Sequence, residues 1–293
     1  MTQGRLHLPP DFRPTEVLAF HARDPERRAE RVVGAQLEKA LVVSGQPVVL
    51  RVALEGDAAS YASDRPDTVR GEVLRHIVAG LLGLNADPGP FEARASQDPL
   101  LGPAVRQQRG LRIPQTATPF EAITWAITGQ QITLGFAITL RRRLIEAVGL
   151  PASGDLIAYP EAAQVVKLTA DELGAMQYSR AKADALLRVA AMVVDGELDF
   201  TALAKLPAEQ ALAKLVAIKG IGPWTAHYTQ MRGLGMLDCS LHGDVAVRKA
   251  ISRLRGDGVR VEQKEAERIL AAYAPYRSLA AAHLWASLRT FSA

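Results

Sequence analysis

The stretch IKGIGPWTA, residues 218–226, combines residue types and a spacing that suggest close contact with a partner. The preceding segment, PAEQALAKLVA, has its leucines on one helical face, and Pro223 suits the first position of a helix. We therefore predict two helices joined by a tight turn, in which Gly220 and Gly222 adopt backbone angles closed to other residues. Free N–H groups at the start of the second helix would then bind a phosphate.

The turn has two other interpretations. A Gly-x-Gly pair also begins the dinucleotide-binding fingerprint, but that motif follows a strand and contains a third glycine, and this pair has neither. A purely structural connection between two helices has the same local sequence. The glycines alone therefore leave phosphate binding and a structural turn as alternatives.

Asp244 begins a second informative segment. Val247, Ala250, Ile251 and Leu254 mark one face of a helix, so Asp244 is expected at its N-cap. Helix N–H groups would keep such a carboxylate ionised and fix its direction. Asp244 is therefore either an ordinary cap or a cap that also stabilises positive charge on a substrate.

Aromatic side chains accompany these two segments. Trp224 and Tyr228 are four residues apart and would share one helical face, and Trp285 lies in a later helical segment. Aromatic residues at this spacing often belong to a core, yet only 5% of the chain is aromatic and two of its three tryptophans are these. The alternative is a ligand site lined by aromatic faces.

The composition excludes several kinds of site. The single cysteine, Cys239, permits neither an intrachain disulfide nor a four-cysteine iron–sulfur cluster. Cys239, His242 and Asp244 form a C-x-x-H-x-D pattern, but a zinc site would need a second pair of ligands. No apolar run reaches the roughly 18 to 20 residues that span a bilayer, so we expect a soluble, cytoplasmic protein without a membrane partner.

Basic residues are concentrated in the last third of the chain. Residues 201–293 contain 13 Lys and Arg against 7 Asp and Glu, whereas residues 1–200 contain 22 against 24. This excess favours a polyanion such as DNA or RNA as the partner of the hairpin region. Other basic residues that could contact phosphates, or simply be solvated, are Arg141, Arg142, Arg143, Arg180, Lys182, Arg248 and Lys249.

Hydrophobic patterns predict the elements that must position these residues. A β-hairpin is expected over 37–56 and a helix over 68–82, followed by a proline-rich stretch and a change of character near residue 110. We predict a mainly α protein: an N-terminal α+β domain at 1–110, with an antiparallel sheet, and an all-helical domain at 111–293 in two lobes, without strands. Its expected helices are 119–148, 160–168, 169–175, 180–195, 207–217, 223–235, 245–254, 262–273 and 276–290.

Four segments together resemble a known family. They are LVAIKGIGPWTAHYTQMRGLG at 215–235, LHGDVAVRKAI at 241–251, PFEAITWAITGQQI at 119–132 and YRSLAAAHLW at 276–285. They resemble the helix-hairpin-helix DNA glycosylases, and within them the bacterial 3-methyladenine DNA glycosylase II group. The resemblance implies the helix-hairpin-helix DNA glycosylase fold, with the motif at 208–235. It also implies a monomer that acts in base excision repair on double-stranded DNA, where it flips alkylated bases out and hydrolyses their N-glycosidic bond.

The resemblance also implies a mechanism. Asp244 follows Gly222 by 22 residues, as the catalytic aspartate of the family does, and would stabilise the oxocarbenium-like sugar and orient or deprotonate the attacking water. Trp224 stands where lyase members of the superfamily have the lysine that forms a Schiff base. The expected enzyme is therefore monofunctional and leaves an abasic site in an uncut strand.

Binding roles follow from the same resemblance. The expected base pocket consists of Trp224, Tyr228, Trp285 and Gln131, and the expected DNA contacts are Lys219, Gly220, Gly222, Thr225, Gln130 and Gln131. The chemistry would need no cofactor, but the backbone carbonyls of Val216, Ile218 and Ile221 are expected to hold Na⁺ or K⁺. Gln131 departs from the leucine that close relatives insert into the gap left by the flipped base. Ala286 departs from a further aromatic residue in their pocket.

Two alternative functions remain open. A non-catalytic helix-hairpin-helix DNA-binding module would need the hairpin but neither Asp244 nor an aromatic pocket. An oxidised-purine glycosylase with lyase activity is disfavoured because Trp224 replaces the lysine.

Overall fold

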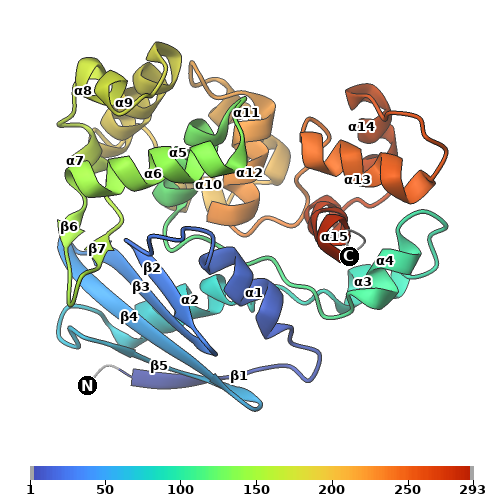
Figure 1. The fold of residues 1–293 in the computed structure, drawn as a ribbon, viewed down its shortest axis with the longest axis horizontal. Coiled ribbons are helices and arrows are strands. Elements are labelled where there is room, and N and C mark those ends of the chain that lie inside the picture. Colours follow the sequence, from blue (N-terminus) through green and yellow to red (C-terminus); the bar gives the residue numbers. More distant parts are fainter. Residues whose placement is uncertain (1–2, 291–293) are drawn as a thin grey trace.

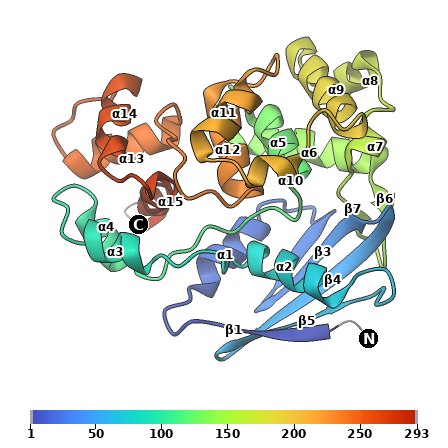
Figure 2. The same ribbon diagram turned by 180° about the vertical axis from the view of Figure 1, so that it is seen from behind.

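The N-terminal part of the chain forms an antiparallel five-stranded sheet in the order β1-β5-β4-β3-β2, seen in a computed structural model that describes residues 3–290. Its elements are β1 (Gln3–His7), α1 (Pro14–His21), β2 (Glu30–Val33), β3 (Gln36–Val43), β4 (Gln46–Glu55), β5 (Ala58–Ser63) and α2 (Gly71–Leu81). Helix α2 lies behind the sheet in Figure 1 and in front of it in Figure 2, so it covers one face.

The predicted hairpin over 37–56 is confirmed, because β3 and β4 pair antiparallel along their length. Its turn contains Ser44 and Gly45, both with positive φ, of 50° and 76°. Leu50 packs under α2 and is fully buried, and so is Val49 on the opposite face. The second face is buried because a short ribbon from the helical part lies against it.

Most of the remaining chain is helical, which confirms the mainly α fold class. The elements are α3 (Gly89–Ala95), α4 (Gly102–Gln107), α5 (Pro119–Gly129), α6 (Leu134–Val148), β6 (Leu150–Pro151), β7 (Ile157–Ala158), α7 (Ala162–Val165), α8 (Ala170–Ala175), α9 (Arg180–Val194), α10 (Phe200–Ala204), α11 (Ala208–Val216), α12 (Pro223–Gly233), α13 (Val245–Arg255), α14 (Gln263–Ala271) and α15 (Arg277–Thr290). No helix within the described residues is both long and apolar enough to cross a membrane.

The structure corrects two of the expected elements. The helix predicted over 119–148 is broken into α5 and α6, because Gln131 has a φ of 53° and cannot continue a right-handed helix. The second correction is that the region after residue 110 does contain strands, the two-residue β6 and β7. Leu156 and Ala158 of this ribbon pack on Val49, so the ribbon covers the sheet rather than forming part of a helical core.

Helix α12 runs between two hydrophobic cores. Its Ala226 belongs to a core shared with α5, α9 and α11, whereas its Tyr228 belongs to a core shared with α13 and α15. In Figure 1, α11 and α12 lie between the group α5 to α9 and the group α13 to α15. Phe91 of α3 and Val105 of α4 are buried in the Tyr228 core, so these two helices pack with the C-terminal helices although they precede residue 110.

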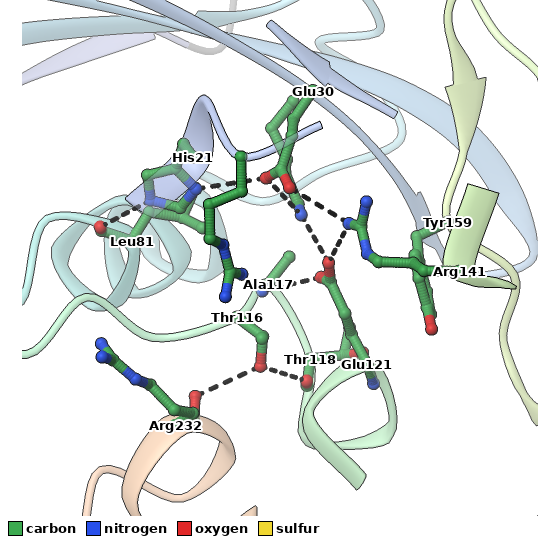
Figure 3. A network of polar contacts seen from close by, with 12 residues as sticks. His21, Glu30, Leu81, Thr116, Ala117, Thr118, Glu121, Arg141, Tyr159 and Arg232 are labelled. Carbon is green, nitrogen blue, oxygen red and sulfur yellow. Dashed lines mark hydrogen bonds and ion pairs between the residues drawn. The ribbon is translucent and has the colours of Figure 1, made fainter. Parts of the chain in front are cut away.

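A buried ion network attaches the sheet to α5 and α6 (Figure 3). Glu30 of β2 and Glu121 of α5 accept hydrogen bonds from Lys39 Nζ at 2.9 and 2.7 Å, and from Arg141 Nη2 at 3.1 and 2.8 Å. Burial alone would raise the pKa of both carboxyl groups, but Lys39 and Arg141 hold it below the usual range. Removing one partner would leave a buried charge unpaired, which would lower the free energy of unfolding by about 3 to 5 kcal/mol. The network therefore fixes α5 on the sheet.

Candidate active site

A single cleft of about 1530 Å³ brings the expected site residues together. Its walls come from α1, the loop between α5 and α6, the turn between α11 and α12, the start of α13, and α15. The expected residues that line it are Gln130, Gln131, Val216, Ile218, Lys219, Gly220, Ile221, Gly222, Trp224, Thr225, Tyr228, Asp244 and Trp285. Segments more than 100 residues apart in the chain therefore face one space.

Asp244 is the N-cap residue of α13, as predicted, and its carboxylate is fixed by three N–H donors. Oδ1 accepts the backbone N–H of Val247 at 2.9 Å and the indole N–H of Trp285 at 3.1 Å. Oδ2 accepts the indole N–H of Trp224 at 2.9 Å. Since a carboxylate has about four acceptor positions, about one remains for a substrate or a water molecule.

The three expected aromatic residues form one group around this carboxylate. The rings of Trp224 and Tyr228 are 5.6 Å apart between centroids and tilted by 34°, and those of Tyr228 and Trp285 are 6.5 Å apart and tilted by 49°. Tyr228 is buried, whereas both tryptophans are half-buried at the cleft wall. Each indole therefore presents part of its surface to the cleft while its N–H is bound to Asp244.

The hairpin between α11 and α12 has the predicted form at one glycine but not at the other. Gly220 has a φ of 97°, and a Cβ there would lie 2.8 Å from the Cβ of Ala185 on α9, so both backbone and packing require glycine. Gly222 has ordinary extended angles, φ −85° and ψ 172°, and an added Cβ would meet nothing within 4 Å. The expectation that Gly222 adopts backbone angles closed to other residues is therefore wrong. The lack of a side chain at Gly222 leaves room for a ligand on the cleft side.

The start of α12 is open. Its N-cap, Gly222, supplies no side-chain cap, and Pro223 at the first position has no N–H. Among the described residues, the N–H groups of Trp224 and Thr225 have no acceptor. The exposed Lys219 lies on the same wall. A helix N-terminus with free donors and a nearby cation is suited to a phosphate.

The loop between α5 and α6 is attached to the hairpin. Gln130 Nε2 donates to the carbonyl of Gly220 at 3.1 Å and to Thr225 Oγ1 at 2.9 Å, and the Thr225 side chain is buried. The side chains of Gln130 and Thr225 thus brace the loop against the hairpin, and both residues line the cleft, so their expected DNA contacts stay a prediction. Gln131, next to this brace, is exposed and lines the cleft, where an inserted side chain would have to stand.

Several other basic candidates make contacts within the protein. Arg141 belongs to the buried network, and Arg142 pairs with Asp24 at 3.4 Å. Lys182 is buried and donates to the carbonyl of Thr128 at 2.8 Å. The other pairings are Arg143 with the carbonyl of Met176, Arg180 with Asp184, and Arg248 with Glu262. Of these candidates Lys249 is exposed.

Comparison with known proteins identifies the family. The description "HhH-GPD superfamily base excision DNA repair protein" matches residues 124–275, more than half of the chain. The chain belongs to this superfamily. The match confirms the resemblance inferred from the four sequence segments, and its range contains the hairpin and Asp244.

Individual relatives agree with this assignment to the HhH-GPD superfamily. A Bacillus subtilis protein named DNA-3-methyladenine glycosylase is 31% identical over 219 residues, which are 74% of this chain and 72% of the relative. DNA-3-methyladenine glycosylase 2 of Escherichia coli is 29% identical over 187 residues, 63% of each chain. The structure of 3-methyladenine DNA-glycosylase from Archaeoglobus fulgidus has a TM-score of 0.86 at 21% identity and covers 99% of both chains, which confirms the fold over nearly the whole length.

The cleft also contains residues that sequence patterns missed. Phe20 of α1 and Arg23, two residues after the end of that helix, line it, as do His227 and His242, whose rings lie 6.4 Å apart. Burial and the neighbouring His242 lower the pKa of His227 to about 4, so His227 is neutral at physiological pH. Phe20 and Arg23 lie some 200 residues before the hairpin and carry no motif, so only the docking of α1 on the helical part reveals them.

Cys239, the first residue of the C-x-x-H-x-D pattern, is buried, and burial raises the pKa of its thiol to about 12. Within the described residues, no group of three or more His, Cys, Asp or Glu side chains is placed to hold a metal ion.

Proposed function

We propose that this HhH-GPD protein is a monofunctional DNA glycosylase that excises alkylated bases in base excision repair. The observation that carries the proposal is the carboxylate of Asp244, fixed by two indole N–H groups inside an aromatic pocket. That pocket opens onto the same cleft as the unpaired helix start of α12. The names of the Bacillus subtilis and Escherichia coli relatives support alkylated bases as the substrates.

The geometry supports a division of labour in the reaction. Free N–H groups at the start of α12 and the side chain of Lys219 bind the DNA backbone, and Gln131 enters the gap left when the target nucleotide leaves the stack. The base stacks among Trp224, Tyr228 and Trp285. As the N-glycosidic bond breaks, positive charge grows on the sugar, and Asp244 stabilises this charge and orients the attacking water through its remaining acceptor position.

Hydrolysis rather than lyase chemistry follows from the side chains present. A lyase needs an uncharged amine next to the sugar, and Trp224 occupies the position where the superfamily's lyases have it. Lys219 is the lysine among the described cleft residues, but it stands on the exposed side of the hairpin turn. The proposed product is therefore a free base and an abasic site in an unbroken strand.

A monovalent cation fits the hairpin, and we include it in the proposal. Among the described residues the carbonyls of Val216 and Ile221 accept no hydrogen bond, and Ile218 accepts one from the N–H of Ile221 at 3.0 Å. All three residues line the cleft. Neutral backbone oxygens suit Na⁺ or K⁺, which would lend positive charge to phosphate binding. The chemistry itself needs no cofactor, and we propose that a monomer acts on double-stranded DNA in the cytoplasm.

The test is an analysis of products. Duplex DNA methylated with dimethyl sulfate is incubated with the protein, released bases are quantified by chromatography, and strand breaks are measured before and after alkali. We expect free methylated purines, breaks only after alkali, and no covalent adduct on borohydride reduction. Breaks before alkali together with an adduct would assign the protein to the lyase alternative. Absence of any released base would favour the non-catalytic DNA-binding module.

A further inference from the structure

One part of the cleft wall carries two guanidinium groups close to one aromatic ring, that of Phe20. Cζ of Arg23 lies 3.9 Å from the ring centroid of Phe20, and Cζ of Arg232 lies 4.4 Å from it. Arg232 also lies 5.6 Å from the ring of Trp285, whose N–H is bound to Asp244. A continuous row of contacts thus leads from α1 to the carboxylate.

The two arginines differ in their burial and in their hydrogen bonds. Arg232 is buried, and its Nη1 donates to the carbonyl of Pro114 at 2.6 Å. Arg23 is half-buried, and only its Nε is engaged, with the carbonyl of Phe20 at 2.7 Å. Among residues 3–288 and the backbone of 289–290, neither Nη atom of Arg23 has a hydrogen-bond acceptor. Cζ of Arg23 also lies 4.9 Å from the ring centroid of Trp125. The rings of Phe20 and Trp125 thus hold the free donors of Arg23 at the cleft wall.

This arrangement distinguishes between bases by charge and by hydrogen-bonding groups. A cationic base gains from aromatic faces, but faces that already carry a guanidinium attract a second cation less, and the two like charges repel. A guanidinium with free N–H groups is instead a strong donor to a carbonyl oxygen on a planar ring. Charge and carbonyl content therefore act on base selection in opposite directions.

We propose that Arg23 is a specificity-determining residue, which favours target bases that present an exocyclic carbonyl oxygen and disfavours cationic bases that lack one. The proposal rests on the glycosylase function proposed above. It adds a selection among damaged bases by a residue that directly follows α1 in the N-terminal part, outside the region that the family description matches.

Four lesions separate the two properties. Hypoxanthine is neutral with a carbonyl, 1,N6-ethenoadenine is neutral without one, 7-methylguanine is cationic with one, and 3-methyladenine is cationic without one. Single-turnover release of each base from duplex DNA is measured for the wild type and for Arg23→Met, which keeps length but removes charge and donors. The ratio of variant to wild type is compared for each lesion, so that differences in leaving-group reactivity cancel. Arg75→Met, an exposed arginine on α2 away from the cleft, is the matched control.

We expect Arg23→Met to lower the release of one lesion and to raise the release of another. Arg23→Met lowers release of hypoxanthine by about 10-fold, the effect of one charge-assisted hydrogen bond, and raises release of 3-methyladenine by roughly 3-fold. Release of 1,N6-ethenoadenine and 7-methylguanine changes little, and Arg75→Met changes none of the four. Equal ratios for all four lesions would overturn the proposal, as would a wild type that releases methylated purines but not hypoxanthine. If the wild type releases no base at all, the glycosylase function itself fails.

Discussion

The starts of α12 and α13 face the same cleft but are built in opposite ways. Helix α12 begins at Gly222, which has no side chain, and the N–H groups that follow are unpaired among the described residues. Helix α13 begins at Asp244, whose carboxylate accepts the N–H of Val247. Because every helix start carries partial positive charge, the first is open to an external anion and the second holds an anion of its own.

The contrast shows how one electrostatic feature can serve two functions. In the proposed function the open helix start binds a phosphate, so a change there should alter affinity for DNA. The capped start holds the proposed catalytic carboxylate in one direction, so a change there should alter the rate of base release. If this separation is correct, substitutions at Gly222 and Asp244 will affect different measured constants.

The largest effect is expected at the capped start. Asp244→Asn should lower single-turnover release of methylated purines on the order of 10³-fold, because the neutral amide no longer stabilises charge on the sugar. Affinity for DNA should be nearly unchanged. The melting temperature should fall modestly, because the asparagine NH2 would face the indole N–H of Trp224, a donor against a donor, although asparagine caps helices about as well as aspartate. Asp199→Asn is the matched control, because Asp199 caps α10 away from the cleft through the N–H groups of Thr201 and Ala202. A comparable loss of affinity in Asp244→Asn would break the separation.

A smaller effect, on affinity, is expected at the open start. Gly222→Asp should weaken DNA binding by roughly 10-fold, because the new carboxylate pairs with the N–H groups and repels phosphate. The free energy of unfolding should not fall, since the backbone angles are ordinary and the space is empty. Titration of labelled duplex DNA gives the dissociation constant, and saturating enzyme gives the rate. Gly222→Ala separates added bulk from added charge; equal weakening by both variants would show that charge is not the cause.

Local signals explain why much of this site could be predicted from the sequence. The hairpin, the N-cap at Asp244 and the spacing of Trp224 and Tyr228 each depend on a few neighbouring residues, so periodicity and residue type suffice. The fold class was predictable for the same reason. The carboxylate's bonds to Trp224 and Trp285 were not, because aromatic spacing indicates a shared face but not which atom each indole N–H meets.

Long-range contacts account for most of what the sequence missed. The bonds from Gln130 to Gly220 and Thr225 join residues 90 and 95 positions apart, and they brace the loop against the hairpin. Phe20 reaches the cleft only because α1 docks on the helical part. The sequence did not reveal the break between α5 and α6, because the apolar pattern continues across it. The backbone at Gln131 nevertheless leaves the helical conformation.

The hydrogen bond from Trp285 to Asp244 gives a third prediction, which concerns the rate of base release and the start of α13. Trp285→Phe keeps an aromatic ring but removes the N–H donor, so release should slow by about 10-fold, in line with one hydrogen bond to a charged group. In an Asp244→Asn background the same change should cost much less, because the charged acceptor is gone. Single-turnover rates for the four members of this double-mutant cycle test the point. Additive losses would mean that Trp285 acts by stacking alone.

Substitution of His227 should have the smallest effect on base release but a clear effect on stability. His227 lies on α12, and its ring is next to that of His242, which precedes Asp244 by two residues. Its pKa is about 4 in the folded protein, because of burial and the nearby His242, against 6.5 for an ordinary histidine. Between these values the unfolded chain binds the proton more readily, so stability falls as pH drops from about 6.5 toward 4, by up to roughly 3 kcal/mol.

His227→Gln should therefore flatten the dependence of the unfolding free energy on pH over this window, measured by urea denaturation. Some slope will remain, since burial also lowers the pKa of His283, to about 3. The rate of base release between pH 6 and 8 should keep its profile in the variant, because His227 is neutral throughout that range. A release profile that shifts with His227→Gln would give this residue a part in the chemistry, and the two helix starts would then be coupled through the histidine pair rather than independent.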